Sequence, residues 1–291
     1  MGHAYHAGVL RALEQGLGWD ARHADLVVGT SAGAQVGALL RAGLHGEDLA
    51  ARVCGEPLRP FAHDIARHYL RPGPGAPDHP RSLSPAAPAY LARTLRTPAL
   101  LRPGRLVAAA LPAGRVSLDP MSRGFQAMFG GAAWPDAHLW ITSVHLDTGE
   151  AVAFGKPGAP PIDVGTAVAC SAAVPGVFRP VEWQGLRYVD GGVASATHLD
   201  LLQPEPLDLV IVSSPLSVFP PMRALVRREL RELERSGTPV ALIEPGGEAA
   251  AAMGYLPMSL ERAPRVARAA YETTLRQIEE GILRQRLRDA F

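Results

Sequence analysis

The sequence predicts an α/β fold in which a mainly parallel sheet is covered by helices on both faces. Short, continuous apolar runs, such as residues 26–29 and 207–213, are typical of strands that are buried on both sides. These runs alternate along the chain with longer segments that carry apolar residues at helical spacing. A chain of 291 residues, 47% of them hydrophobic, can bury a sizeable core, and we expect a single domain over residues 1–291.

The expected elements can be placed in order along the chain. Residues 1–19 carry Val9, Leu10, Leu13 and Leu17 at helical spacing, which predicts a first helix. The remaining expected helices are 32–43, 47–54, 163–171, 222–235 and 261–289. The expected strands are 25–29, 139–146, 151–154, 181–189 (a hairpin turning at Gln184-Gly185), 207–213 and 239–243.

The most distinctive motif lies between the first expected strand and the helix that follows it. Gly29-Thr30-Ser31-Ala32-Gly33 matches the Gly-x-Ser-x-Gly pattern, in which a serine occupies a sharp strand-to-helix turn. The two glycines keep side-chain bulk away where strand and helix approach closely. Free N–H groups at the helix start, including that of Ala32, would face a developing oxyanion. The motif predicts Ser31 as a nucleophile; the alternative interpretation is a structural turn with an idle serine.

A serine nucleophile needs a base, and two residues are candidates. His198 is the best-placed histidine for a Ser-His-Asp arrangement, although a polar residue that ends a loop is the simpler interpretation. Asp190 ends an expected strand, and Gly191 and Gly192 follow it and leave the backbone free around the carboxylate. An ordinary Asp pKa of about 3.9 makes a weak base, and burial would raise that pKa towards the working range.

Taken together, the serine turn and Asp190-Gly191-Gly192 resemble the two catalytic signatures of the patatin-like phospholipase family. Residues 169–178 are similar to its small-residue segment ahead of the aspartate hairpin, and residues 8–13 to its first helix. The resemblance covers residues 1 to about 53 and about 138 to 213. It implies a three-layer α/β/α fold with Ser31 as nucleophile, Asp190 as its base, and a phospholipid or other lipid acyl ester as substrate.

The sequence departs from that family at the loop that supplies the oxyanion hole, Gly-Gly-x-Arg/Lys-Gly. Gly2 fits the last glycine of this loop, and the rest of the pattern would lie upstream of Met1. Loss of one oxyanion donor typically lowers turnover roughly 100- to 1000-fold. Either the true start lies upstream, which we favour, or the protein is a weakened or inactive relative. We expect turnover below that of an intact relative, and an unchanged rate after addition of upstream residues would contradict this.

A variable insertion rich in proline, glycine and arginine is expected at about residues 55–135. Residues 55–88 predict an irregular surface segment. Residues 81–115 contain no acidic residue and six arginines: Arg81, Arg93, Arg96, Arg102, Arg105 and Arg115. This stretch is either a cap whose basic and apolar face meets an anionic lipid surface, or an ordinary insertion with a solvated arginine face. We prefer the second interpretation.

Composition excludes several classes of function. A net charge of +1 gives no electrostatic case for nucleic-acid binding. No HExxH motif or Cys/His cluster occurs, so neither a metal nor a cofactor is expected for the reaction. Cys54 and Cys170 lie far apart, as in a reduced intracellular protein. With no signal peptide and no apolar run of about 18 residues, we expect a cytoplasmic protein that can associate peripherally with a membrane.

Three functional hypotheses therefore remain. The first is a serine acyl hydrolase of lipids, a phospholipase A or lysophospholipase-like esterase, that uses Ser31 and Asp190. The second is a catalytically degenerate lipid-binding or regulatory protein on the same scaffold. The third is an ordinary Ser-His-Asp esterase with His198 or another histidine as base.

Overall fold

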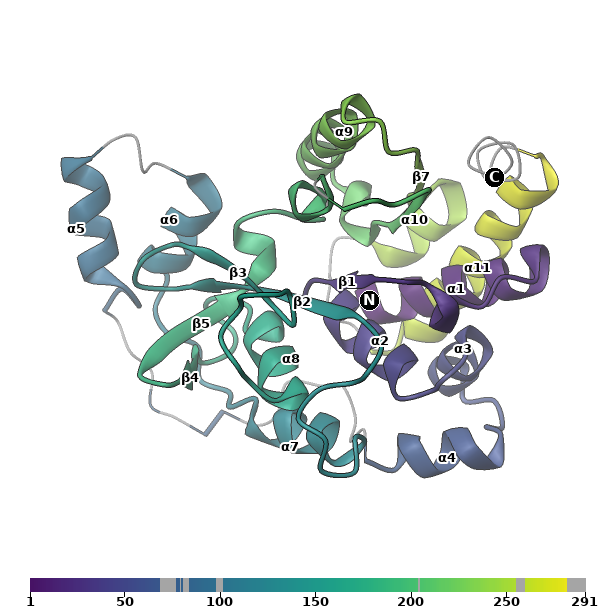
Figure 1. Cartoon of the computed structure of the whole chain (residues 1–291), viewed down its shortest axis with the longest axis horizontal. Coiled ribbons are helices and arrows are strands. Elements are labelled where there is room, and N and C mark those ends of the chain that lie inside the picture. The colour runs from purple at the N-terminus through teal and green to yellow at the C-terminus, as the bar shows by residue number, and fades with distance from the viewer. Residues whose placement is uncertain are drawn as a thin grey trace. The chain divides into compact units, whose positions relative to one another are not determined.

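The computed structural model describes residues 1–68, 77–78, 80, 84–97, 102–203, 205–254 and 260–281 (Figure 1). The chain forms two compact units, each assembled from separate segments. The first unit comprises Met1–Ala24, Gly43–His63 and Ala196–Phe291, and the second comprises Asp25–Ala42 and Asp64–Ser195.

The second unit is built on a five-stranded mixed sheet. Its strands are β1 (Val27–Gly29), β2 (Leu139–His145), β3 (Ala151–Phe154), β4 (Val181–Trp183) and β5 (Leu186–Asp190). Only β1 runs parallel to β2, whereas β3 and β5 run antiparallel to it and β4 runs antiparallel to β5. The α/β class is confirmed, and the prediction of a mainly parallel sheet is wrong. The physical reason is local, because strands joined by a tight turn must pair antiparallel.

The turn between β4 and β5 illustrates this constraint. Gln184 and Gly185 both have positive φ, 49° and 75°, which is the backbone twist that a two-residue hairpin turn requires. The hairpin expected over residues 181–189 is therefore present with the predicted turn.

Strand β2 brings the ends of β1 and β5 together. Gly29 at the end of β1 is paired with Ile141, and Asp190 at the end of β5 is paired with Ser143. Ile141 and Ser143 both pair with β3 as well, so β1 and β5 must share the opposite edge of β2. Because they run in opposite directions along that edge, their carboxyl ends meet beside Thr142.

Helices of the second unit pack on this sheet and on one another. They are α2 (Ala32–Arg41), α5 (Pro88–Arg96), α6 (Pro103–Ala110), α7 (Asp119–Ala127) and α8 (Val164–Ala172). Helices α2 and α8 contact β2 and each other, and α7 packs on α8. A Cβ at Gly165 of α8 would lie 2.1 Å from the Ser122 carbonyl oxygen of α7, so this close packing depends on a small residue.

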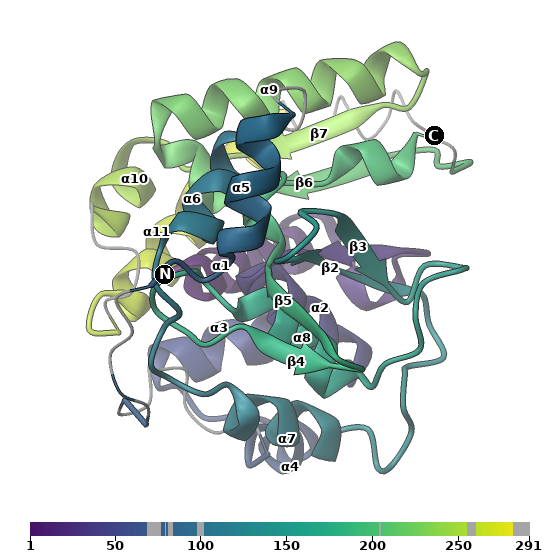
Figure 2. The same cartoon turned by 90° about the vertical axis from the view of Figure 1, so that its left-hand side faces the viewer.

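The expected insertion contains regular structure. Helices α5 and α6 lie side by side (Figure 2). Their buried residues form one apolar cluster with the sheet, made of Ala87, Tyr90, Ala109, Val144, Leu146 and Val189. Helix α4 (Pro60–Ala66) forms within residues 55–88, so irregular structure is a wrong prediction there. Ala62 and Ile65 are buried one helical turn apart, and this pairing favours the helix.

The first unit combines helices with a two-stranded parallel sheet, β6 (Val210–Ser213) and β7 (Val240–Ile243) (Figure 2). Its helices are α1 (Gly2–Leu17), α3 (Gly46–Cys54), α9 (Pro220–Arg235), α10 (Gly247–Met253) and α11 (Ala263–Glu279). Helix α1 packs directly on α11, where a Cβ at Gly8 would lie 2.1 Å from the Ala267 carbonyl oxygen. The expected closing helix over 261–289 is present as α11, and residues 282–291 lie outside the described residues.

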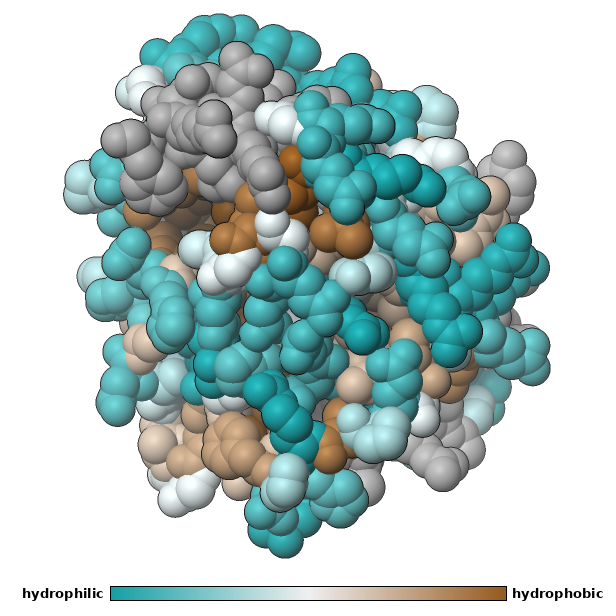
Figure 3. Space-filling view, turned by 90° about the vertical axis from the view of Figure 1, so that its right-hand side faces the viewer, coloured by the Kyte–Doolittle hydropathy of each residue, from teal (hydrophilic) through white to brown (hydrophobic). Residues whose placement is uncertain are grey.

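The distribution of hydrophilic and apolar residues on the surface is that expected of a protein whose apolar residues are mostly buried. Hydrophilic residues predominate on the face drawn in Figure 3, and apolar residues gather in limited areas of it. No helix in the described part of the chain is both long and apolar enough to cross a membrane.

Candidate active site

Ser31 lies in the sharp turn that the Gly-x-Ser-x-Gly pattern predicts. The residue joins β1 to α2 with φ 54° and ψ −115°, a conformation that L residues rarely adopt. A Cβ at Gly29 would lie 2.6 Å from the backbone N and Cα of Ala34. The turn therefore requires glycine at this position, and it stores strain of about 1–3 kcal/mol at Ser31.

A buried serine from α8 fixes the backbone of this turn. The Ser31 N–H donates a hydrogen bond of 2.8 Å to the Ser171 hydroxyl, which is fully buried. The N–H groups of Gly33 and Ala34 donate to the carbonyl oxygens of Thr30 and Ser31. Across the described residues, the Ala32 N–H has no hydrogen-bond acceptor. The Ala32 N–H is therefore available to an oxyanion.

The sequence analysis does not identify Ser171 as a site residue. It lies in the small-residue segment that resembles the family, but the segment gives no sign of which residue faces the turn. Its contact with Ser31 joins residues 140 positions apart and depends on the packing of α8 against α2.

The Asp190 carboxylate lies at the end of β5, where the carboxyl ends of β1 and β5 meet beside Thr142 of β2. Asp190 is the last residue of β5, and the residue is buried, with 6% of its surface exposed. One carboxylate oxygen accepts the Gly192 N–H at 2.7 Å, and the carboxylate also accepts a hydrogen bond from the Ser31 side chain. The structure thus brings together Ser31 and Asp190, the two residues that the sequence motifs predict as nucleophile and base.

Burial changes the acid–base chemistry of this carboxyl group. Loss of water around Asp190 raises its pKa from 3.8 to about 6, although hydrogen bonds from Ser31 and Gly192 stabilise the charged form. A carboxylate with this pKa is ionised at neutral pH and is a better proton acceptor than an exposed aspartate.

The loop after Asp190 needs its glycines for close packing. A Cβ at Gly191 would lie 2.5 Å from the Thr142 hydroxyl, and one at Gly192 would lie 3.0 Å from the Asp190 carboxylate. Because neither position carries a side chain, the loop can pack closely against β2, and space is left around the carboxylate, as the Asp-Gly-Gly pattern predicts.

Helix α6 of the expected insertion contacts the same loop. A Cβ at Gly104 would lie 2.2 Å from the Val193 carbonyl oxygen, so the two backbones touch. The arginine-rich segment 81–115 therefore includes a helix that touches the loop at Val193, three positions after Asp190 in the chain.

The family described as "Patatin-like phospholipase" matches residues 1–202, well over half of the chain. The chain belongs to the patatin-like phospholipase family. Family membership implies a lipid acyl hydrolase, and the resemblance seen in the sequence is confirmed. No curated protein sequence matches the chain.

The matched range contains Ser31 and Asp190 together with the glycines beside them, Gly29, Gly33, Gly191 and Gly192. Two further predicted residues belong to the first unit. Gly2 is the first residue of α1, and His198 is buried with φ 52° at the start of a short 3-10 helix, Leu199–Leu202. The oxyanion role of Gly2 and the alternative role of His198 as base stay predictions.

Proposed function

We propose that this member of the patatin-like phospholipase family hydrolyses lipid acyl esters with Ser31 as nucleophile and Asp190 as general base. One observation carries the proposal: a strained serine donates a hydrogen bond to a buried carboxylate whose pKa is raised to about 6. Both groups needed for acyl transfer are therefore in contact without an imidazole between them.

The reaction proceeds in two steps. Asp190 accepts the hydroxyl proton as the Ser31 oxygen attacks the ester carbonyl, and the Ala32 N–H donates to the developing oxyanion. The ester C–O bond then breaks, Asp190 returns the proton to the leaving alcohol, and an acyl-serine remains. Asp190 next deprotonates a water that attacks the acyl-serine, which releases the fatty acid and restores the Ser31 hydroxyl.

Three variants separate this mechanism from the Ser-His-Asp alternative. Hydrolysis of a short-chain ester and of a phospholipid should be abolished in Ser31→Ala and in Asp190→Asn. The same rates should be largely kept in His198→Ala, because the proton acceptor is the carboxylate. Loss of activity in His198→Ala, with Asp190→Asn still active, would favour the histidine-based triad.

A second experiment separates the hydrolase from a catalytically degenerate scaffold. A fluorophosphonate reacts covalently with activated serines, and mass spectrometry then locates the modified residue. We expect labelling of Ser31, loss of labelling in Ser31→Ala and strong slowing in Asp190→Asn. The Ser236→Ala variant is the matched control, because its hydroxyl donates only to a helix carbonyl oxygen. Absence of labelling in the parent, together with retained lipid binding, would favour the degenerate scaffold.

We also propose that helices α5 and α6 bring the enzyme to an anionic lipid surface. Val107 and Leu111 of this region are exposed, at 58% and 38%, beside a stretch without acidic residues. Exposed apolar groups among arginines fit a membrane interface. Co-sedimentation with anionic vesicles should weaken when Arg93, Arg96, Arg102 and Arg105 are replaced by glutamine. Equal binding of parent and variant would leave the segment as an ordinary insertion.

A further inference from the structure

We propose that Arg105 of helix α6 binds the phosphate group of a phospholipid whose ester lies at Ser31. This role builds on the proposed hydrolase function and narrows its substrate class to acyl esters that carry a phosphate a few bonds from the scissile ester. Arg105 lies in the first turn of α6 and within the arginine-rich segment 81–115.

Helix α6 begins beside the loop that follows the proposed base. The helix contacts the 3-10 helix Gly191–Val193, and a Cβ at Gly104 would lie 2.2 Å from the Val193 carbonyl oxygen. A 3-10 helix rises about 2.0 Å per residue, so Val193 lies only about 6 Å along this helix from Asp190. Arg105 directly follows Gly104, so its long side chain starts close to Asp190.

Both neighbours of Arg105 in the chain are fixed against this loop. Gly104 touches Val193, and Leu106 packs with Val193 against the apolar cluster that contains Tyr90. Side chains on a helix lean towards its N-terminal end, and in α6 this is the end beside Val193. We therefore expect the Arg105 guanidinium to lie towards the loop rather than away from it.

The Arg105 side chain lacks the partners that a partly buried arginine requires. Its Nε atom is buried and has no hydrogen-bond acceptor. Within the part of the chain that the structure describes, the guanidinium has no carboxylate at ion-pair distance, and segment 81–115 contains no acidic residue. Burial of a charged donor without an acceptor is unfavourable. A molecule that binds beside α6 would supply the missing acceptor.

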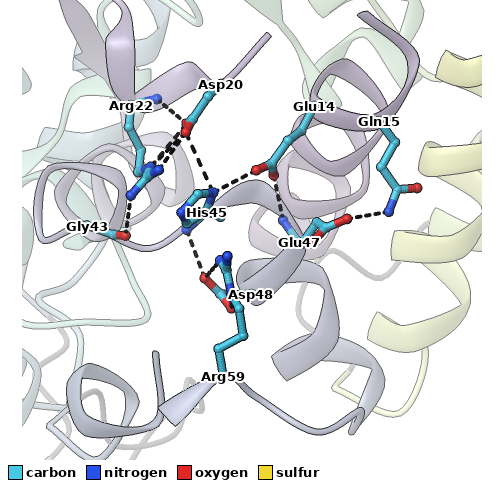
Figure 4. Close-up of polar contacts among 9 residues, drawn as sticks. All are labelled: Glu14, Gln15, Asp20, Arg22, Gly43, His45, Glu47, Asp48 and Arg59. Carbon is cyan, nitrogen blue, oxygen red and sulfur yellow. Dashed lines mark hydrogen bonds and ion pairs between the residues drawn. The ribbon is translucent and has the colours of Figure 1, made fainter. Parts of the chain in front are cut away.

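Other partly buried arginines are paired within the chain. In Figure 4, the Arg22 guanidinium donates to both carboxylate oxygens of Asp20. The Nε atom of Arg11 is buried without an acceptor, as in Arg105, but Nη1 of Arg11 lies 3.1 Å from Glu56 Oε2. The charge of Arg105 has no such compensation, which distinguishes this residue from a structural arginine.

The chemistry of the site favours a phosphate. A guanidinium is always charged, and its planar fork of donors matches two oxygens of one phosphate group. The N-terminus of α6 has no capping side chain, so its partial positive charge adds to the attraction. A neutral ester would leave the guanidinium unpaired. A phospholipid can place its ester at Ser31 and its phosphate at Arg105, because only a few bonds separate the two groups.

The first test measures binding of ligands that are not hydrolysed. The probe is dihexyl-glycerophosphocholine, a diether phospholipid kept below its critical micelle concentration, and its matched control is the neutral diether dihexylglycerol. Monomers present no lipid surface, so this test is separate from the proposed membrane contact of α5 and α6. Calorimetry should show that Arg105→Gln weakens phospholipid binding at least about tenfold and leaves binding of the neutral diether unchanged.

Two further variants sharpen this comparison. Arg105→Lys keeps the charge but loses the planar fork, so its affinity for the phospholipid should lie between those of the parent and Arg105→Gln. Arg123→Gln is the matched control, because Arg123 is an exposed arginine of α7 in the same unit. This control removes the same charge and should keep the parental affinity.

The second test measures hydrolysis of the corresponding diesters, dihexanoyl-glycerophosphocholine and dihexanoylglycerol. Arg105→Gln should raise KM for the phospholipid at least about tenfold and keep kcat, because the phosphate contact is equal in the bound substrate and the transition state. The kinetic constants for the neutral ester should not change. Thermal unfolding shows whether the variants fold.

Four outcomes decide the matter. Parental affinity of Arg105→Gln for the diether phospholipid would overturn the proposal. Equal losses for the phospholipid and the neutral diether would assign Arg105 a structural role instead. Binding of inorganic phosphate that is lost in Arg105→Gln, while both diethers still bind, would assign the site to free phosphate and not to a headgroup. Absence of hydrolysis in the parent, with diether phospholipid binding that depends on Arg105, would contradict the hydrolase and support the phosphate site.

Discussion

The Thr30 hydroxyl lies 2.7 Å from the Thr142 hydroxyl at the point of β2 where β1 and β5 meet. Thr30 directly precedes Ser31, and Thr142 lies between the partners of Gly29 and Asp190 on β2. This hydrogen bond therefore joins the serine turn to Thr142 of β2. The loop at Gly191 packs against the same threonine. The serine and the carboxylate are placed by a rigid sheet, which favours a fixed geometry between them.

The activity should depend on the ionisation of Asp190. Since burial raises its pKa to about 6, and only the charged form accepts the Ser31 proton, kcat/KM should rise about tenfold per pH unit below about pH 6 and level off above it. The measurement is a pH–rate profile with an ester that does not itself titrate. A rate that is constant from pH 4.5 to 7.5 would contradict the assignment.

Asp190→Asn should stabilise the protein while it removes activity. An acid whose pKa is raised on folding opposes folding once it ionises, so the penalty is absent below about pH 4 and complete above about pH 6. A rise from 3.8 to about 6 corresponds to roughly 3 kcal/mol. Denaturant unfolding of Asp190→Asn at pH 8 should show a gain of about 1–3 kcal/mol that shrinks towards pH 4.

Asp163→Asn provides the control for that measurement. The Asp163 carboxylate accepts the Thr166 N–H at the start of α8, so its substitution should leave stability unchanged or lower it slightly. A stability gain at pH 8 in Asp163→Asn equal to that in Asp190→Asn would show that the effect does not arise from burial of Asp190.

Ser171→Ala should lower turnover by an effect on the backbone of the serine turn. Without the Ser171 hydroxyl, the Ser31 N–H loses its acceptor, and the free energy of unfolding should fall by about 1–3 kcal/mol. We expect kcat to drop on the order of tenfold because the strained turn is no longer held. Ser122→Ala, whose hydroxyl contacts Thr166 away from the turn, should keep kcat. Equal kcat values in the two variants would argue against a positioning role for Ser171.

Gly29→Ala should disrupt the serine turn directly. Its Cβ would lie 2.6 Å from backbone atoms of Ala34, which cannot move aside as a flexible side chain can. We expect a loss of at least about 1–3 kcal/mol in stability and nearly complete loss of hydrolysis. In the control Gly246→Ala, the nearest atom is 3.9 Å away and φ is −116°, so activity should be kept and stability should change by less than about 1 kcal/mol.

Local sequence patterns predicted where the strands lie but not the directions in which they run. Apolar runs correctly located β1, β2, β6 and β7, because strand formation responds to the spacing of neighbouring apolar residues. Strand direction depends on partners that are distant in the sequence, and the two hairpins made the larger sheet mixed. The sequence patterns do not predict helices α4, α7 and α10. These helices are short, and their stability depends on the surfaces they pack against.

The sequence by itself determined the residue types of the site: a serine between two glycines after a strand, and an aspartate before two glycines after another. Such turns are encoded by adjacent residues, since only glycine permits the close approaches at Gly29 and Gly191. Only the tertiary structure decided that Ser31 meets Asp190 at one edge of β2, that burial raises the Asp190 pKa, and that Ser171 holds the turn. The physical reason is that register, burial and long-range hydrogen bonds arise from packing between distant segments, which local propensity does not specify.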